Sequence, residues 1–228
     1  MNESPYPRSV RAEAAAAAAD LQSVGPVQAV LRFYRRHDAV IEAALADSPG
    51  PVACRDGCAH CCQYKIEASA AEVLAIRRYV LSEFSAERRA EVLARAERNA
   101  AEAADLSHLE QLITNQVCPF LHERSCSIYP VRPINCRSFH STDVAACRRS
   151  VEELREPTLQ VPYFADVFDA ARGSRDGFTQ AGRTAGAEVT MYDLASAFVE
   201  AMQQAEDDTA LQARRPMFAR AKVIGAPA

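Results

Sequence analysis

Residues 54–62 read Cys-Arg-Asp-Gly-Cys-Ala-His-Cys-Cys, which places four thiols in one short segment: Cys54, Cys58, Cys61 and Cys62. Gly57 precedes the second of them and allows a backbone turn that other residues disfavour. Because ligands close together in sequence cost little loop-closure entropy, several sulfurs can converge on one centre. Pro, Gly and Asp residues also fill 47–60, so we expect this segment to be a metal-binding loop.

Four further cysteines follow at wider spacing: Cys118, Cys126, Cys136 and Cys147. The chain has 8 cysteines in all, and none lies outside the region from Cys54 to Cys147. Buried structural thiols have no reason to cluster in this way. Four plus four sulfurs would satisfy two tetrahedral zinc sites or one iron–sulfur cluster. We therefore expect all eight to bind zinc or iron, with a [4Fe–4S] cluster as one form of the iron alternative.

Four other interpretations of the cysteines are weaker. A disulfide framework would suit a secreted chain, but we find no signal-peptide core, and Cys61 and Cys62 could pair together only in a strained ring. The spacing of Cys54, Cys58 and Cys61 is that of radical-SAM enzymes, yet the β/α pattern and a Gly-Gly segment are missing. Unrelated buried thiols, or a Cys–His nucleophile, would leave the clustering unexplained.

Histidines and arginines near the cysteines are candidates for supporting roles. His60 and His140 are possible additional ligands, whereas we expect His37, His108 and His122 on the surface. Arg132, Tyr129 and Arg137 stand beside cysteines. They could hydrogen-bond thiolates or bind an anionic substrate, and the alternative is that they fix the loop against the core.

Composition excludes several classes of partner. The 228 residues carry a net charge of −4, and basic residues stand mostly beside acidic ones, so no nucleic-acid footprint is expected. No stretch approaches the roughly 18 apolar residues of a membrane span. We expect a cytoplasmic protein, where thiols stay reduced, with metal ions as partners. The sequence does not indicate a protein partner.

The elements expected from periodicity are mostly helices. Glycine is scarce, with 8 residues, and apolar side chains recur at helical spacing. We expect a helical domain around an irregular cysteine-rich centre with short β pieces near 120–121 and 127–129, so the fold class is mainly α. The expected helices cover 11–23, 26–46, 70–84 after a Ser69–Glu72 capping box, 86–115 after Ser85, 142–153, 162–184 and 191–205.

Three regions are expected along the chain. N-terminal helices occupy 1–50, a cysteine domain with a helical pair occupies 51–150, and C-terminal helices packing on the same domain occupy 151–228. We expect 1–10 and 222–228 to be frayed. The Met and aromatic stripe at 191–202 is interpreted as core rather than as a cofactor site.

The chain resembles the YkgJ-type cysteine-cluster proteins, described as zinc- or iron-chelating domains. Their CxxxCxxCC signature matches Cys54, Cys58, Cys61 and Cys62. Their second signature, CPFL…CxIYxxRPxxCRxF, matches the segment from Cys118-Pro-Phe-Leu through Cys126-Ser-Ile-Tyr to Arg132-Pro-Ile-Asn-Cys136-Arg-Ser-Phe139. Many members have a further cysteine where this chain has Ser141, so Cys147 or His140 would complete the ligand set.

The resemblance implies a metal-binding protein, and it covers roughly residues 50–150. A flagellin lysine-methylating protein carries a similar cluster, which implies an iron–sulfur centre in some relatives. An iron–sulfur enzyme or redox protein, for example one related to flagellin lysine N-methylation, is therefore the alternative to a plain metal-binding module. Whether the chain is an enzyme is left open, because it shows no glycine-rich SAM loop.

Overall fold

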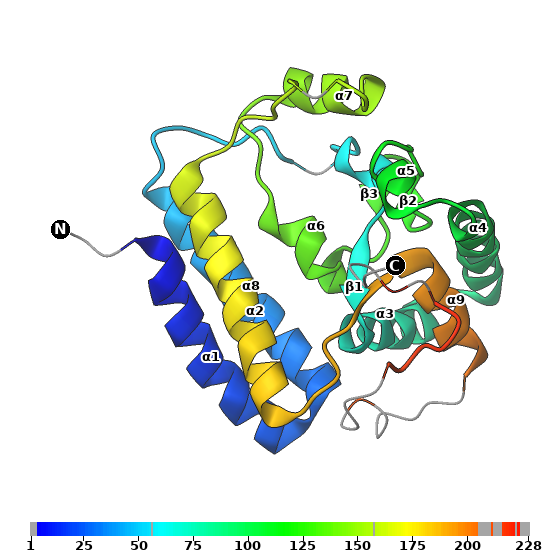
Figure 1. Cartoon of the computed structure of the whole chain (residues 1–228), viewed down its shortest axis with the longest axis horizontal. Coiled ribbons are helices and arrows are strands. Elements are labelled where there is room, and N and C mark those ends of the chain that lie inside the picture. Colours follow the sequence, from blue (N-terminus) through cyan, green and yellow to red (C-terminus); the bar gives the residue numbers. More distant parts are fainter. Residues whose placement is uncertain are drawn as a thin grey trace.

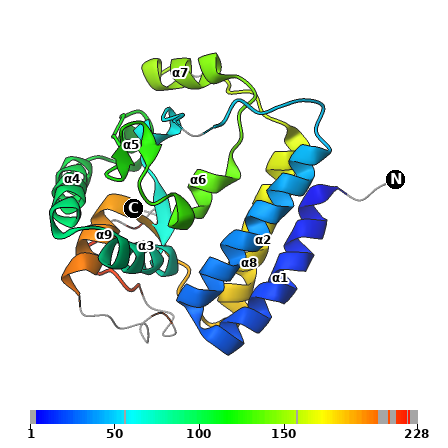
Figure 2. The same cartoon turned by 180° about the vertical axis from the view of Figure 1, so that it is seen from behind.

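The computed structural model describes residues 4–55, 57–156, 158–204, 211, 216–221 and 223. Figures 1 and 2 show a bundle of three long helices on one side and a group of shorter helices on the other, with the cysteine-bearing segments between and above them. The predicted mainly α fold with short β pieces is confirmed. No helix among these residues is both long enough and apolar enough to cross a lipid bilayer.

The bundle consists of α1 (Pro5–Val24), α2 (Pro26–Ala46) and α8 (Ala165–Ala185). Gly25, with φ of 77°, is the only residue between the first two helices, and Pro26 starts the second as its position predicts. Helix α1 runs alongside α8 so closely that a Cβ added to Gly177 would lie 2.5 Å from the Val10 carbonyl oxygen. Only glycine fits at that crossing.

The expectation that residues 1–10 are frayed is wrong from Pro5 onward, because tertiary contacts hold the first turns of α1. The Tyr6 hydroxyl donates to Asp176 over 2.9 Å, and the Arg172 guanidinium lies 4.2 Å from the centre of the Tyr6 ring. Residues 1–3, 222 and 224–228 lie outside the described residues.

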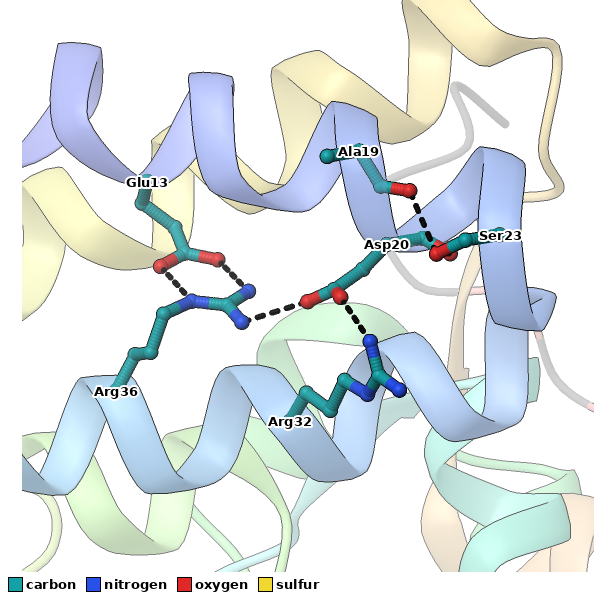
Figure 3. Close-up of polar contacts among 6 residues, drawn as sticks. All are labelled: Glu13, Ala19, Asp20, Ser23, Arg32 and Arg36. Atoms are coloured by element: carbon teal, nitrogen blue, oxygen red, sulfur yellow. Dashed lines mark hydrogen bonds and ion pairs between the residues drawn. The ribbon is translucent and has the colours of Figure 1, made fainter.

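An ionic network joins α1 to α2 (Figure 3). Arg36 binds both oxygens of Glu13, at 2.9 and 2.6 Å, and also reaches Asp20 at 2.6 Å. Arg32 completes the network with a 2.7 Å contact to Asp20. Burial raises the pKa of Glu13 although Arg36 pairs with it. Burial also acts to raise the pKa of Asp20, but the hydrogen bonds from Arg32 and Arg36 outweigh burial, so the pKa of Asp20 is lowered. Both carboxylates are buried, so the arginines are required to satisfy them.

Two strand–helix units form the opposite side. The strand β1 (Glu67–Ser69) leads into α3 (Ala70–Glu83), and β4 (Met191–Asp193) leads into α9 (Leu194–Gln203). The strands pair antiparallel, with Ala68 opposite Tyr192. The predicted Ser69–Glu72 capping box is present. Helix α9 starts three residues later than expected because Met191–Asp193 pair with β1, and Leu194 and Phe198 are buried core residues, as expected.

The long helix expected over 86–115 is divided. Ser85 caps α4 (Ala86–Ala104) by accepting from the Arg88 amide, as predicted. A second capping box, made by Ser107 and Glu110, then starts the separate helix α5 (His108–Leu112). The Ser107 cap competes with continued helix, because its side chain satisfies the backbone N–H groups of a new first turn.

Short elements make up the part of the chain that carries most cysteines. They are the 3₁₀ turn η1 (Cys61–Gln63), the hairpin strands β2 (Leu121–His122) and β3 (Ser125–Cys126), the 3₁₀ turn η2 (Tyr129–Val131), and helices α6 (Ile134–Ser138) and α7 (Val144–Glu152). The β piece expected near 120–121 is confirmed, but the one expected at 127–129 is wrong, because the hairpin ends at Cys126 and Pro130 lies in a 3₁₀ turn. We call residues 54–63 and 116–152 the cysteine layer.

Candidate metal centre

The first cysteine group lies on a loop built from successive tight turns. Gly57 has φ of 78°, the left-handed conformation that its place before Cys58 predicts. The Cys58 amide donates to the Arg55 carbonyl over 3.1 Å, and the Cys62 amide donates to Ala59 over 3.2 Å. Asp56 lies outside the described residues. The turns bring the four thiols of this group onto a short length of backbone.

The second group is joined to the first through the backbone. The Cys118 amide donates to the Cys62 carbonyl over 2.8 Å, and the Gln116 amide donates to Gln63 over 2.8 Å. These two bonds fix residues 116–118 beside the end of the first loop. A further backbone bond, from Ala53 to Ser141 over 2.7 Å, fixes the start of that loop near α7. Both ends of the first cysteine segment are therefore held against parts of the chain that carry the second.

By their electrostatic interactions with one another, the thiols fall into two sets, and these sets differ from the two cysteine groups along the sequence. An inner set gathers around Cys61 and contains members of both groups: Cys61, Cys62, Cys118, Cys126 and Cys136. An outer set combines the first two cysteines with the last: Cys54, Cys58 and Cys147. Cys61 interacts with both sets. Two distant stretches of chain thus contribute sulfurs to each set.

All eight cysteines are free thiols in this structure. Cys54 and Cys61 are exposed and the other six are half-buried. Within the described residues, no three His, Cys, Asp or Glu side chains lie close enough together to hold a metal ion. The structure therefore brings the thiols into each other's neighbourhood without placing them at coordination distances, and the ligand set stays a prediction.

Burial dominates the acidity of most of these thiols. It raises the pKa of Cys118 to about 12 and that of Cys136 well above its usual value, and it raises the pKa of Cys126 as well. The Cys61 pKa is lowered, because the Cys62 thiol donates a hydrogen bond to it and Arg132 adds positive charge. Charge on a buried sulfur is thus unfavourable unless something compensates it, and a bound metal ion would do so.

Two arginines flank the inner set in different ways. The Arg137 side chain is buried; it pairs with Asp38 at 2.6 Å, donates to the carbonyls of Pro130 and Arg132, and lies over the Tyr34 ring. These contacts fit the expectation that it fixes the loop against the core. Arg132 lies over the Tyr129 ring, 4.0 Å from its centre, and its Nε is buried without a hydrogen-bond partner among the described residues.

The histidines follow the expectations only in part. His37 was expected on the surface but is completely buried in α2, where Nε2 contacts the Ser138 hydroxyl at 3.1 Å. Burial, reinforced by the charge of Arg137, lowers the pKa of His37 to about 3. His122 is exposed as expected, and the side chain of His108 lies outside the described part of the chain. His60 and His140 are half-buried within the cysteine layer, and their role as ligands stays a prediction.

Sequence reasoning missed the residues that hold α6, the helix that carries Cys136. Glu72 Oε1 accepts from the Ile134 amide over 2.7 Å and from the Tyr34 hydroxyl over 3.0 Å, while its other oxygen completes the capping box of α3. His37 contacts the same helix through Ser138. The capping box was the only sequence signal at Glu72, and it gave no indication of the link to residue 134.

The cysteine layer lies within the part of the chain that matches a known protein-family model. Residues 53–158 match the CxxCxxCC family model, described as a "putative zinc- or iron-chelating domain". No curated protein and no solved structure matches the chain. The match covers both cysteine groups and supports metal binding, specifically of zinc or iron. Residues 53–158 thus match the model of a zinc- or iron-chelating domain, which is the kind of domain that the sequence resemblance predicts.

Proposed function

We propose that this protein chelates zinc or iron through the thiolates of the inner set, Cys61, Cys62, Cys118, Cys126 and Cys136. The single observation that carries the proposal is that Cys61 interacts with sulfurs from both cysteine groups, although more than fifty residues separate it from Cys118. Thiolate donors suit zinc and iron–sulfur centres alike. The outer set of Cys54, Cys58 and Cys147 provides further sulfurs beside the same Cys61.

The donor set favours these metals over the harder ions. Magnesium and calcium prefer carboxylate and carbonyl oxygens, and the inner set consists of sulfur alone. The nearby Arg132 would repel a cation bound without thiolate charge. A bound metal would supply positive charge among the buried sulfurs and would displace their protons on binding.

An iron–sulfur centre serving redox chemistry or catalysis is the second candidate, and the number of sulfurs favours it. Five thiols in the inner set exceed the four that a mononuclear tetrahedral zinc site uses. A polynuclear cluster, or two zinc ions that share the inner and outer sets, would use more of them. A relation to flagellin lysine N-methylation belongs to this candidate, and it derives only from the sequence resemblance.

Elemental analysis with a visible spectrum of anaerobically purified protein distinguishes the candidates. Iron with inorganic sulfide and a brown colour would support the cluster, and colourless protein with about two zinc ions would support the plain module. Protein that contains neither metal and takes up neither on reconstitution would contradict the proposal.

The site assignment is tested by a pair of double variants. Cys61→Ser with Cys118→Ser removes one inner thiol from each group and should abolish high-affinity metal binding. Cys54→Ser with Cys147→Ser, taken from the outer set, removes the same number of sulfurs and should retain at least one tightly bound ion. Normal metal content in the first pair would refute the assignment.

A further inference from the structure

The two arginines beside the inner set differ in their counter-ions. Arg137 is paired with Asp38 at 2.6 Å, so its charge is already compensated. Within the described residues, Arg132 has no carboxylate partner, and its Nε atom is buried without a hydrogen bond. A buried guanidinium nitrogen without a partner is costly, and native proteins rarely leave one in that state. Unlike the charge of Arg137, the charge of Arg132 is therefore not neutralised by a carboxylate of the described residues.

The position of Arg132 is fixed on both its backbone and its side chain. Its carbonyl accepts from Arg137 Nε over 3.0 Å, and its amide donates to the Tyr129 carbonyl over 3.4 Å. The guanidinium stacks on the Tyr129 ring, 4.0 Å from the ring centre. A cation held in this way keeps its place relative to the neighbouring thiols, because the backbone on both sides of it belongs to the cysteine layer.

Arg132 follows η2 directly, between Cys126 at the end of β3 and Cys136 in α6. From that position its charge acts on both of these cysteines and on Cys61 of η1. Four thiolates around one divalent ion leave two net negative charges, since each ligand loses its proton to solvent on binding. In a half-buried site that charge is poorly screened by water. A fixed cation beside the sulfurs would therefore stabilise the loaded centre more than the protonated, metal-free thiols.

We propose that Arg132 is the counter-ion of the metal–thiolate centre and offsets its net negative charge. This inference rests on the proposed function, because it needs a metal held by the inner thiolates. Arg132 is a positioning and charge-compensating residue, not a ligand. Partners outside a ligand set commonly change metal affinity by about 10- to 100-fold, and we expect Arg132 to act in that range.

The test measures Zn²⁺ affinity at fixed neutral pH by competition with a chromophoric chelator, under reducing conditions. Arg132→Met should weaken Zn²⁺ binding by about 10- to 100-fold, and Arg132→Lys, which keeps the charge, should stay within about threefold of wild type. Arg148→Met is the matched control: it removes an exposed arginine next to Cys147 and should leave the affinity unchanged. The unfolding temperature of each metal-free variant separates an effect on the centre from a loss of fold.

Titration with Co²⁺ gives a second readout that a merely structural role would not move. The sulfur-to-cobalt absorption should saturate at higher Co²⁺ in Arg132→Met while keeping its intensity, because the ligands themselves are retained. If Arg132→Met does not fold, Arg132→Gln takes its place in both assays.

Three outcomes are distinguishable. Wild-type protein that binds no metal would contradict the proposed function itself. Wild-type affinity in Arg132→Met would overturn the counter-ion role and leave the proposed function standing. Equal losses in Arg132→Met and Arg132→Lys would also overturn it, since they would point to packing on Tyr129 instead of charge.

Discussion

The bundle of α1, α2 and α8 and the cysteine layer differ in what holds their elements together. In the bundle, helices of 20 and 21 residues meet through close backbone contact at Gly177 and through a complete ionic network around Arg36. In the cysteine layer the longest helix has 9 residues, and the half-buried thiols Cys118 and Cys126 pack against the hydrophobic core to which Phe120, Ile128 and Ile134 belong. The bundle is held by contacts between its own helices, whereas the layer combines apolar anchors with thiols that a metal would join under the proposed function.

Metal removal should produce the largest difference in stability between the two regions. Structural zinc sites contribute roughly 10–16 kcal/mol of binding free energy, so a chelator should loosen the layer while leaving the bundle folded. Hydrogen exchange followed by mass spectrometry would show faster exchange in residues 54–63 and 116–152 and unchanged exchange in α1, α2 and α8. Equal loss of protection in both regions would contradict this division.

The close crossing in the bundle gives the next largest effect. Gly177→Ala should lower the free energy of unfolding by about 3 kcal/mol, because the added Cβ meets a backbone oxygen that cannot move aside. The loss would occur although alanine favours helix more than glycine does. Gly50→Ala is the control, since its Cβ would meet only the Phe164 ring at 4.0 Å. Urea denaturation of both variants measures the difference, and equal stabilities would show that the crossing is loose.

The ionic network makes a third prediction. Arg36→Met leaves Glu13 and Asp20 buried with only Arg32 nearby, which should cost about 3 kcal/mol in the free energy of unfolding. The exposed neighbour Arg35→Met should cost almost nothing. Thermal unfolding of the two variants tests this, and a neutral Arg36→Met would mean that solvent satisfies both carboxylates.

A pH effect on stability is expected at His37, which lies in α2 of the bundle and contacts Ser138 in the cysteine layer. Its pKa is about 3 in the folded protein against an ordinary value of 6.5, so below pH 6.5 the unfolded chain binds a proton that the folded chain excludes. Stability should therefore fall as the pH falls from 6.5 toward 3, with His37 contributing about 2 kcal/mol between pH 6.5 and 5.

Denaturant unfolding of metal-free protein at pH 7 and pH 5 measures this contribution. His37→Asn should flatten the pH dependence, whereas the exposed His122→Asn should leave it as in wild type. A slope in His37→Asn equal to that of wild type would show that His37 is not the group responsible.

Local signals in the sequence predicted the elements that depend on neighbours along the chain. Pro26 starts α2, Ser69 and Glu72 cap α3, and Gly57 turns the first cysteine loop, each by chemistry within four residues. Helix α6 was not predicted, because its first amide is satisfied by Glu72 from 62 residues upstream. A five-residue helix has no periodicity that could indicate it.

For the candidate site, too, the sequence predicted some features and not others. Spacing and the family resemblance predict the cysteines as ligands, which stays a prediction, and all eight lie within the matched residues 53–158. Spacing could not show that Cys61 interacts with Cys118 and Cys136, while Cys54 interacts with Cys147, since these interactions depend on how distant segments lie together in the fold. The burial of His37 could not be predicted from the sequence either, because a single histidine in a helical segment does not indicate which residues pack against it. The expected boundaries of three regions at 1–50, 51–150 and 151–228 stay predictions.

X-ray absorption spectroscopy at the edge of the bound metal, on protein purified without oxygen, tests the central claim most directly. If thiolates from both cysteine groups hold the ion, the first shell should consist of sulfur alone, at about 2.3 Å for zinc. A first shell dominated by nitrogen or oxygen would contradict the account.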